Sequence, residues 1–234
     1  MGKRIISQRR GRATSTYRVR KKAFKYKLQF LKKLEGKGTV LKLVNSSAHS
    51  CPLAKIKSKE GIFFIPAFRG MYEGQEISFE GTKIQDGNIF KLKDIPLKTK
   101  IYCIESRPGD GGKFIKTGGN HAVVNRKIGT NTMVLMPSKK EKKFHANCRA
   151  VIGVIAGQGR LDKPVLKAGK KHHIKKAKSK LWPRTSAVKM NKIDHRFGSG
   201  RGKNPKSKIA KRNAPPGKKV GLIRPRRTGK KKWT

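Results

Sequence analysis

The sequence contains very little negative charge. Of its 234 residues only 12 are Asp or Glu, against 61 Lys or Arg, so the formal net charge at pH 7 is +49. With so large an excess of positive charge, the side chains repel one another in a compact chain unless a polyanion neutralises them. The shortage of acidic residues therefore argues against a free-standing enzyme or protein-binding module, and it predicts a partner dense in phosphate.

Long apolar runs and paired cysteines are also missing. The longest run of apolar residues and glycine covers residues 150–157, whereas a membrane-spanning helix needs roughly 18 apolar residues. The three cysteines, Cys51, Cys103 and Cys148, are odd in number and far apart, which fits neither a disulfide framework nor a CxxC zinc site. We expect no membrane segment, and three buried thiols in a reducing compartment.

The positive charge is spread unevenly along the chain. The net charge is +13 over residues 1–37, +3 over 38–105, +17 over 106–188 and +16 over 189–234. The last segment has only 6 Leu, Ile, Val or Phe among its 46 residues, too few to offset the entropy of ordering so charged a chain. We expect residues 189–234, and much of 1–35, to lack a core of their own and to become ordered on a polyanion.

The nearly neutral segment has the pattern of a small β-barrel. Short runs rich in β-branched and aromatic residues predict strands at 39–44, 53–57, 61–68, 75–79, 89–93 and 101–104. Asp86-Gly87, between residues 82–84 and 89–91, is a strong signal for a hairpin with a type I′ turn. Strands of this number and length are typical of an OB-fold or an SH3-like barrel.

The next segment repeats the pattern with more glycine and more charge. Strands are predicted at 114–116, 121–125, 132–136 and 149–156, which indicates a second small barrel. Residues 167–180 have helical potential but no apolar face. Phe24, Leu28 and Leu31 have helical spacing, while Phe24, Tyr26, Leu28 and Phe30 alternate as in a strand, so that segment stays open between the two.

Three features invite a catalytic or ligand-binding interpretation. The glycines of residues 108–120 lack the spacing of a phosphate-binding loop, so they either bring backbone amides close to RNA or simply form turns. The neighbouring His172 and His173 do not match metal-ligand spacing. Asp194 and His195 could form an oriented base, but residues adjacent in sequence rarely face each other, and an RNA-contacting turn fits better.

Basic runs interleaved with aromatic residues favour RNA as the polyanion. Examples are KLWPR at 180–184, RF at 196–197 and KKW at 231–233. Aromatic and arginine side chains stack on unpaired bases, while lysines neutralise phosphates. About ten phosphate contacts would give a slope of log affinity against log salt on the order of −7 to −9.

Several segments, in a fixed order, form a recognisable set. They are ESRPGDGGKF at 105–114, CRAVIG at 148–153, KAGKK at 167–171, WPR at 182–184, MN at 190–191 and DH at 194–195, with the opening MGKRII and the closing RRTG at 226–229. The set closely resembles the universal ribosomal large-subunit protein two family in its archaeal and eukaryotic form. The chain departs from the family at Thr185-Ser186 (Arg-Gly in the family), Lys192-Ile193 (Pro-Val), Arg196 (Pro) and Gly198-Ser199-Gly200 (three glycines).

The resemblance implies an all-β chain with an OB-fold barrel, an SH3-like barrel and long basic extensions. We place the N-terminal extension at 1–35, the OB-fold domain at 36–100, the SH3-like domain at 101–180 and the C-terminal extension at 181–234. It also implies a primary rRNA-binding protein of the large subunit, near the subunit interface, that supports subunit joining, tRNA binding and the peptidyl-transferase region. Its expected partners are large-subunit rRNA, other ribosomal proteins and the small subunit, without membrane contact or homo-oligomer, in the cytoplasm.

The candidate rRNA-binding residues follow from the basic runs and from the resemblance, which carries over Met190, Asn191, Asp194 and His195. They are Arg9, Arg10, Arg12, Arg69, Arg107, Gly111, Gly112, Lys113, Lys170, Lys171, His172, Trp182, Arg184, Met190, Asn191, Asp194, His195, Arg196, Arg201, Arg226 and Arg227. No catalytic residue, metal ligand or cofactor is expected, apart from Mg²⁺ or K⁺ ions held by the RNA. Two alternatives remain, an RNA-processing enzyme that uses Asp194 and His195, and a DNA-compacting basic protein.

Overall fold

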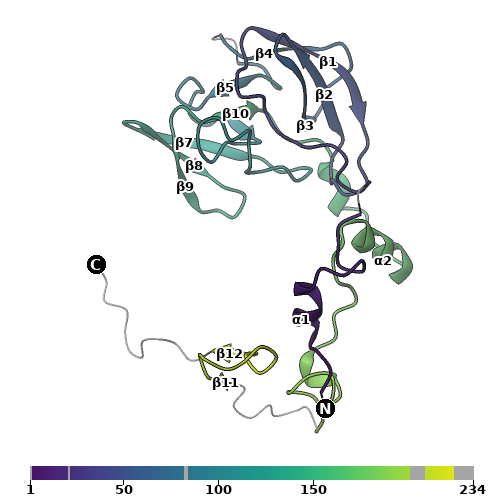
Figure 1. Cartoon of the computed structure of the whole chain (residues 1–234). Helices are drawn as coiled ribbons and strands as arrows, with labels where there is room; N and C mark the ends of the chain where they lie inside the picture. Colours follow the sequence, from purple (N-terminus) through teal and green to yellow (C-terminus); the bar gives the residue numbers. More distant parts are fainter. Residues whose placement is uncertain (1, 21, 82–83, 201–208, 224–234) are drawn as a thin grey trace. The chain divides into compact units, whose positions relative to one another are not determined.

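The computed structural model describes residues 2–20, 22–81, 84–200 and 209–223. The chain divides into two compact units, which we call the barrel unit, Arg20–Lys178, and the terminal unit, made of Met1–Val19 and Ser179–Thr234. Figure 1 shows both units, with labels on many of their helices and strands.

The first sheet of the barrel unit is antiparallel and has the strand order β3-β2-β1-β4. Its strands are β1 (Lys37–Val44), β2 (Leu53–Ser58), β3 (Gly61–Pro66) and β4 (Glu76–Ser78). Alternation along the strands turns one face inward, so that Val40, Ile56, Ile65 and Ile77 are almost completely buried in one hydrophobic core.

The second sheet of the barrel unit is also antiparallel, with the order β5-β10-β6-β7-β8-β9. Its strands are β5 (Ile89–Lys91), β6 (Lys100–Tyr102), β7 (Ala122–Ile128), β8 (Asn131–Leu135), β9 (Glu141–His145) and β10 (Arg149–Ile152). A second core fills it, with Phe90, Ile101, Val134 and Phe144 among its buried side chains. Strand β5 belongs to this second sheet, although it lies within residues 36–100, the range expected for the first barrel domain.

The prediction of an all-β chain is confirmed, because strands far outnumber helices among the described residues and both sheets of the barrel unit are antiparallel. Strands occur at all six predicted positions of the first barrel and at three of the four in the second. The segment 114–116 forms only an isolated bridge between Phe114 and Ile104. Strand β9 was not predicted, because four of its five residues are polar and only Phe144 is buried.

The predicted type I′ hairpin at Asp86-Gly87 is wrong. Gly87 has a φ of +98°, but Asp86 is not among the residues with positive φ, and a type I′ turn needs positive φ at both positions. The Asn88 N–H donates to the Gln85 carbonyl, which closes a turn with positive φ only at its third residue, as in type II. The strand that leaves this turn, β5, pairs with β10; residues 82–83 of the expected partner segment lie outside the described residues.

The second half of the predicted N-terminal extension contributes to the barrel core. Leu28 and Phe30 are buried there, Leu28 and Gln29 form bridges with Phe64 of β3, and the helical alternative for this segment is not observed. The strand-like alternation of Tyr26, Leu28 and Phe30 was therefore the informative pattern.

The remaining elements are short. The barrel unit also contains η1 (Gln158–Leu161) and α2 (Ala168–Ala177), and the terminal unit contains α1 (Ile6–Gly11), η2 (Ala187–Lys189), β11 (Ile209–Ala210) and β12 (Leu222–Ile223). Among the described residues of the terminal unit, Ile5 and Ala210 are the only buried hydrophobic side chains. No helix in the described ranges is long and apolar enough to cross a membrane.

Candidate nucleic-acid interface

The loop that follows β6 is built around a buried carboxylate. Glu105 is completely buried, and its Oε1 accepts hydrogen bonds from the Gly111 N–H (3.1 Å) and from Arg149 Nε (3.0 Å) and Nη2 (2.6 Å). Its Oε2 accepts the Arg149 backbone N–H at 2.8 Å. These contacts satisfy the charge inside the protein, as a buried carboxylate requires.

Arg149 connects this loop to the segment that precedes β1. Its Nη1 donates to the carbonyl of Leu31 at 2.9 Å and to that of Lys32 at 3.3 Å, and its guanidinium lies 5.5 Å from the centre of the Phe30 ring. All three guanidinium nitrogens are therefore engaged within the protein. Arg149 positions the loop and the preceding segment rather than offering a free fork to a phosphate.

A second carboxylate shapes the rest of the loop. Asp110 Oδ2 accepts the N–H groups of Ser106 (3.0 Å) and Arg107 (3.2 Å), and Oδ1 accepts the Gly112 N–H (3.2 Å). Because the Gly111 N–H goes to Glu105, the amides of both predicted glycines are already used by carboxylates. Of the two roles left open for these glycines, the turn-forming one has direct support.

Gly111 and Gly112 are required at their positions by both conformation and space. Their φ values are +82° and +83°, and a Cβ would lie 2.1 Å from the Gln29 side chain and 2.6 Å from the Cys103 carbonyl oxygen, respectively. Only glycine fits both conditions without strain. The cations of the same loop, Arg107 and Lys113, are exposed, so the loop keeps its carboxylates inside and its positive charges outside.

Sequence reasoning missed a basic cluster on the barrel unit. Lys116 Nζ donates to the Leu28 carbonyl (2.9 Å), Arg160 Nε donates to the Gly118 carbonyl (3.0 Å), and the Gly118 N–H donates to Ser50 Oγ (2.9 Å). These residues come from separate segments and none lies in a long basic run, so no local signal could have identified them. Arg69, a predicted site residue, is exposed after β3.

His49 belongs to the same region. Its Nδ1 is 2.7 Å from Ser46 Oγ, and its ring packs edge-on against Phe24 at 5.0 Å. Burial lowers the pKa of His49, and the positive charges of Lys116 and Lys178 lower it further. The imidazole is thus held preferentially neutral beside cations.

Helix α2 presents a continuous basic surface. None of its residues is buried and none of its first-turn residues is acidic; the predicted site residues Lys170, Lys171 and His172 are all exposed on it. The large apolar side chain of α2, Ile174, is itself exposed, so the helix gains little from packing on its own protein. A hollow of about 320 Å³ beside it is lined by further basic side chains, among them Arg20, Lys22 and Lys176.

In the terminal unit, Met190, Asn191, Asp194 and His195 lie together in one tight loop. The Asn191 carbonyl accepts the N–H groups of Asp194 (3.0 Å) and His195 (3.2 Å), and the Met190 carbonyl accepts the N–H of Ser199 (3.0 Å). Gly198 is buried, and a Cβ there would lie 2.3 Å from the Asn191 carbonyl oxygen. The loop thus closes through its backbone despite the differences from the family pattern.

The environment of His195 is basic. The Phe197 N–H donates to His195 Nδ1 at 3.1 Å, which leaves Nε2 as the protonated nitrogen of the neutral ring. Lys3 Nζ is 3.9 Å from Asp194 Oδ1, and Arg196 Nη1 donates to the Lys218 carbonyl at 2.9 Å. A hollow of about 370 Å³ adjoins His195 and is lined by residues 2–5, Gln8 of α1, the 192–196 loop and residues 216–217.

The other predicted positions of the terminal unit are more dispersed. Arg9, Arg10 and Arg12, on and after α1, are exposed, as is Arg184, and Trp182 is half-buried. Arg201, Arg226 and Arg227 lie outside the described residues. Within the described ranges, no group of three His, Cys, Asp or Glu residues could hold a metal ion.

The three cysteines are buried, as predicted, and unpaired. Burial raises the pKa of Cys51 to about 11, that of Cys103 to about 12 and that of Cys148 to about 11. Thiols with such values are protonated at neutral pH and are poor nucleophiles. They serve as small hydrophobic side chains.

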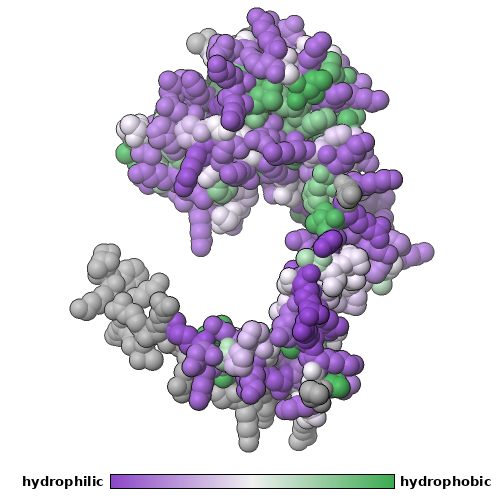
Figure 2. All heavy atoms as spheres, viewed as in Figure 1, coloured by the Kyte–Doolittle hydropathy of each residue, from purple (hydrophilic) through white to green (hydrophobic). Residues whose placement is uncertain are grey.

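The face of the protein seen in Figure 2 is predominantly hydrophilic. In Figure 2, hydrophilic side chains cover most of the visible face of the barrel unit, with hydrophobic ones gathered near the first sheet. Exposed positive charge and close-packed loops together suit a surface that binds a polyanion.

Comparison with known proteins gives consistent matches. The family described as Ribosomal Proteins L2, C-terminal domain, matches residues 85–217. The protein named large ribosomal subunit protein uL2 of Archaeoglobus fulgidus is 45% identical over 234 residues, which covers 98% of this chain and 99% of the relative. Proteins of the same name from Methanococcoides burtonii and Methanocaldococcus jannaschii are 42% and 41% identical, and each match covers 99% of this chain and 100% of the relative.

Proposed function

The chain belongs to the large ribosomal subunit protein uL2 family, and from that premise we propose that it binds large-subunit rRNA directly as a primary rRNA-binding protein. It is a structural component of the large ribosomal subunit in the cytoplasm and not an enzyme. The finer roles that we propose are support of subunit association, tRNA binding and organisation of the peptidyl-transferase region.

One observation carries the proposal of direct rRNA binding. The positive charge is exposed where the protein has least core of its own, on α2 and in the terminal unit. Such segments gain stability when phosphates neutralise them and release counterions. The exposed arginines on and after α1, and the tight loop around His195, extend the same type of surface.

We propose that the loop of residues 190–199 approaches the functional RNA of the subunit. Its backbone hydrogen bonds fix the direction of His195, and its neighbours Lys3, Lys192 and Arg196 supply positive charge around the adjoining hollow. In this proposal His195 positions RNA, Mg²⁺ or K⁺ ions are held by the RNA, and no cofactor is bound by the protein. Contacts with the small subunit and with other ribosomal proteins, and a monomeric state, belong to the same proposal.

The proposal is tested by binding of the full chain to large-subunit rRNA fragments at several salt concentrations. A slope of log affinity against log salt on the order of −7 to −9 is expected if about ten phosphates are contacted. Replacing Lys170 and Lys171 with Gln should make the slope shallower by up to about 2. A matched control replaces Lys139 and Lys140, which are exposed in the turn between β8 and β9.

Two results would contradict the proposal. One is equal affinity for duplex DNA and for rRNA fragments in moderate salt, which would favour the DNA-compacting alternative. The other is recovery of the native protein only in fractions free of large subunits. The RNA-processing alternative is not retained, because the family is a structural one.

A further inference from the structure

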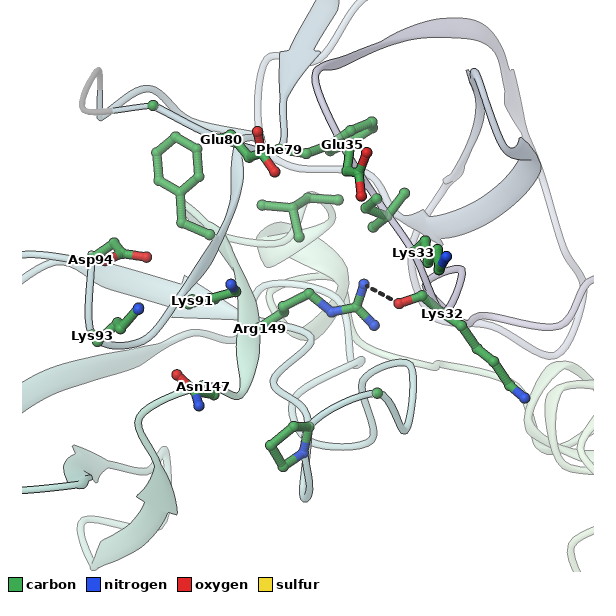
Figure 3. A pocket seen from close by; sticks show the side chains of 16 residues that line it. Lys32, Lys33, Glu35, Phe79, Glu80, Lys91, Lys93, Asp94, Asn147 and Arg149 are labelled. Atoms are coloured by element: carbon green, nitrogen blue, oxygen red, sulfur yellow. Dashed lines mark hydrogen bonds between the residues drawn. The ribbon is translucent and has the colours of Figure 1, made fainter.

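One hollow of the barrel unit is lined by side chains of both signs of charge. It has a volume of about 650 Å³ and lies where residues 32–35, residues 79–81, β5 and the loop at 108–109 meet (Figure 3). Phe79 and Ile89, which belong to the first hydrophobic core, form an apolar floor, while the neighbouring Phe90 packs into the second core. Pockets of this size accept drug-sized molecules and nucleotides.

The carboxylates of this hollow are notable in a chain that has so few. Three of the 12 acidic residues, Glu35, Glu80 and Asp94, line it. Glu35 and Glu80 are held next to each other, because the Phe79 N–H donates to the Gly36 carbonyl at 2.9 Å. In Figure 3 both come from the same edge of the hollow.

Cations surround the same space. Lys32, Lys33, Lys91 and Lys93 are exposed around it, and Arg149 crosses it with its guanidinium turned to the Lys32 carbonyl (Figure 3). Since Arg149 already donates to Glu105, Leu31 and Lys32, it serves as a fixed wall. The four lysines are the groups that a guest could neutralise.

This distribution of charge selects the kind of guest. Four lysines lie beside three carboxylates, so the lining is net positive even with Arg149 paired to Glu105. It therefore repels a cationic peptide side chain, whereas a plain phosphate would be attracted but would leave the carboxylates without donors. A guest that fits carries an anionic group, a flat apolar body and hydrogen-bond donors. An unpaired nucleotide of a single-stranded or looped RNA has all three.

The donor pattern then distinguishes the four bases. Guanine presents two adjacent donors, N1–H and N2–H, on its Watson–Crick edge, and a carboxylate has two acceptor oxygens that match them. Adenine, cytosine and uracil each place an acceptor beside their donor, so a carboxylate would meet a lone pair. A pair of carboxylates over an apolar floor therefore prefers guanine.

We propose that this hollow binds one unpaired guanine nucleotide of an RNA, with Glu35 or Glu80 accepting from its Watson–Crick edge, its ring on the apolar floor and its phosphate among the lysines. The inference rests on the proposed binding of rRNA and deepens it, because it adds a base-specific contact to an interface otherwise dominated by phosphate.

The test uses the full-length protein and fluorescein-labelled RNA pentamers of equal charge, UUGUU, UUAUU, UUCUU and UUUUU. Binding is measured by fluorescence anisotropy at one moderate salt concentration. Because the pentamers carry equal charge, phosphate contacts contribute equally to the affinity of all four. The wild type should bind UUGUU roughly 5- to 150-fold more tightly than the other three, the discrimination of one good bidentate pair. The double variant Glu35→Gln with Glu80→Gln should bring that ratio to within about twofold.

A charge-matched control replaces Glu60 and Glu73 with Gln; both are exposed and lie outside the hollow. It should keep the guanine preference, although its affinity for all four pentamers rises slightly. The inference is overturned if the wild type shows no preference for UUGUU, or if the Glu35 and Glu80 variant keeps it. Either result leaves the proposed function standing as long as rRNA fragments bind; failure to bind them overturns the proposed function instead.

Discussion

Replacing Glu105 with Gln is expected to destabilise the barrel unit strongly. The Glu105 side chain is fully buried and that of Arg149 is only 12% exposed, and the carboxylate accepts four hydrogen bonds, three of them from Arg149. Gln has the same shape, but its amide nitrogen would face one of these donors, and the Arg149 charge would lose its counterion. Removing one partner of such a pair costs about 3–5 kcal/mol, a large part of the stability of an ordinary domain.

The measurement is urea unfolding of the full chain followed by far-ultraviolet circular dichroism, with the free energy obtained by linear extrapolation. Glu141→Gln is the matched control, because it removes the same charge from an ion pair with Arg126 whose two side chains are 31% and 59% exposed. That pair should contribute less than about 1 kcal/mol. The two variants separate the effect of burial from the effect of net charge.

A third variant tests the physical reason for the loss. Replacing both Glu105 and Arg149 with Met removes the unpaired charge along with its partner, so part of the lost stability should return. The reasoning would be refuted if Glu105→Gln and Glu141→Gln unfolded at the same urea concentration, because burial of the carboxylate would then have no measurable consequence.

Three further predictions follow from backbone conformation and from pKa shifts. Gly112→Ala should destabilise the barrel unit by about 2 kcal/mol or more in the same urea assay, whereas Gly109→Ala, with a similar φ but open space around its Cβ, should cost only about 1 kcal/mol of strain. Because burial lowers the pKa of His49 below 6.5, its imidazole binds a proton more readily in the unfolded chain than in the folded one. The free energy of unfolding should therefore fall as the pH drops below about 6.5, and it should fall less steeply in His49→Gln. Folding raises the pKa values of the three thiols, which contributes stability below pH 9.0 that is lost as the pH rises toward about 11 to 12. At pH 8, mass spectrometry should find iodoacetamide adducts on Cys51, Cys103 and Cys148 only after the protein is unfolded.

The strands of the first sheet could be predicted from the sequence because local pattern and tertiary burial agree there. Strand β9 could not, since Lys142 and its polar neighbours carry no such pattern. What makes it a strand is pairing with β8 and the packing of Phe144 against Phe114, with Lys142 Nζ lying 4.1 Å from the centre of the Phe114 ring. These are non-local contacts that a single segment does not encode.

The sequence predicted which types of residue make up the candidate site, but not how those residues are arranged in space. Exposed cations such as Arg107 and Lys170 follow directly from composition, because unpaired Lys and Arg are rarely buried. The pairing of Glu105 with Arg149 joins residues 44 positions apart, and no spacing rule connects them. For the same reason the amides of Gly111 and Gly112, which the sequence left open between RNA contact and turn formation, could be assigned to carboxylates only in three dimensions.

The few acidic residues contribute to the internal packing of the barrel unit. Glu105 and Asp110 neutralise donors inside one loop while its cations stay exposed, so the barrel unit is held together by its own carboxylates and by two hydrophobic cores. The terminal unit has one acidic residue, Asp194, and only Ile5 and Ala210 as buried hydrophobic side chains in its described part. If the chain binds rRNA as proposed, the order of the terminal unit depends on phosphate more than that of the barrel unit does. Rising salt should then release the terminal unit from RNA before it disturbs the barrel fold.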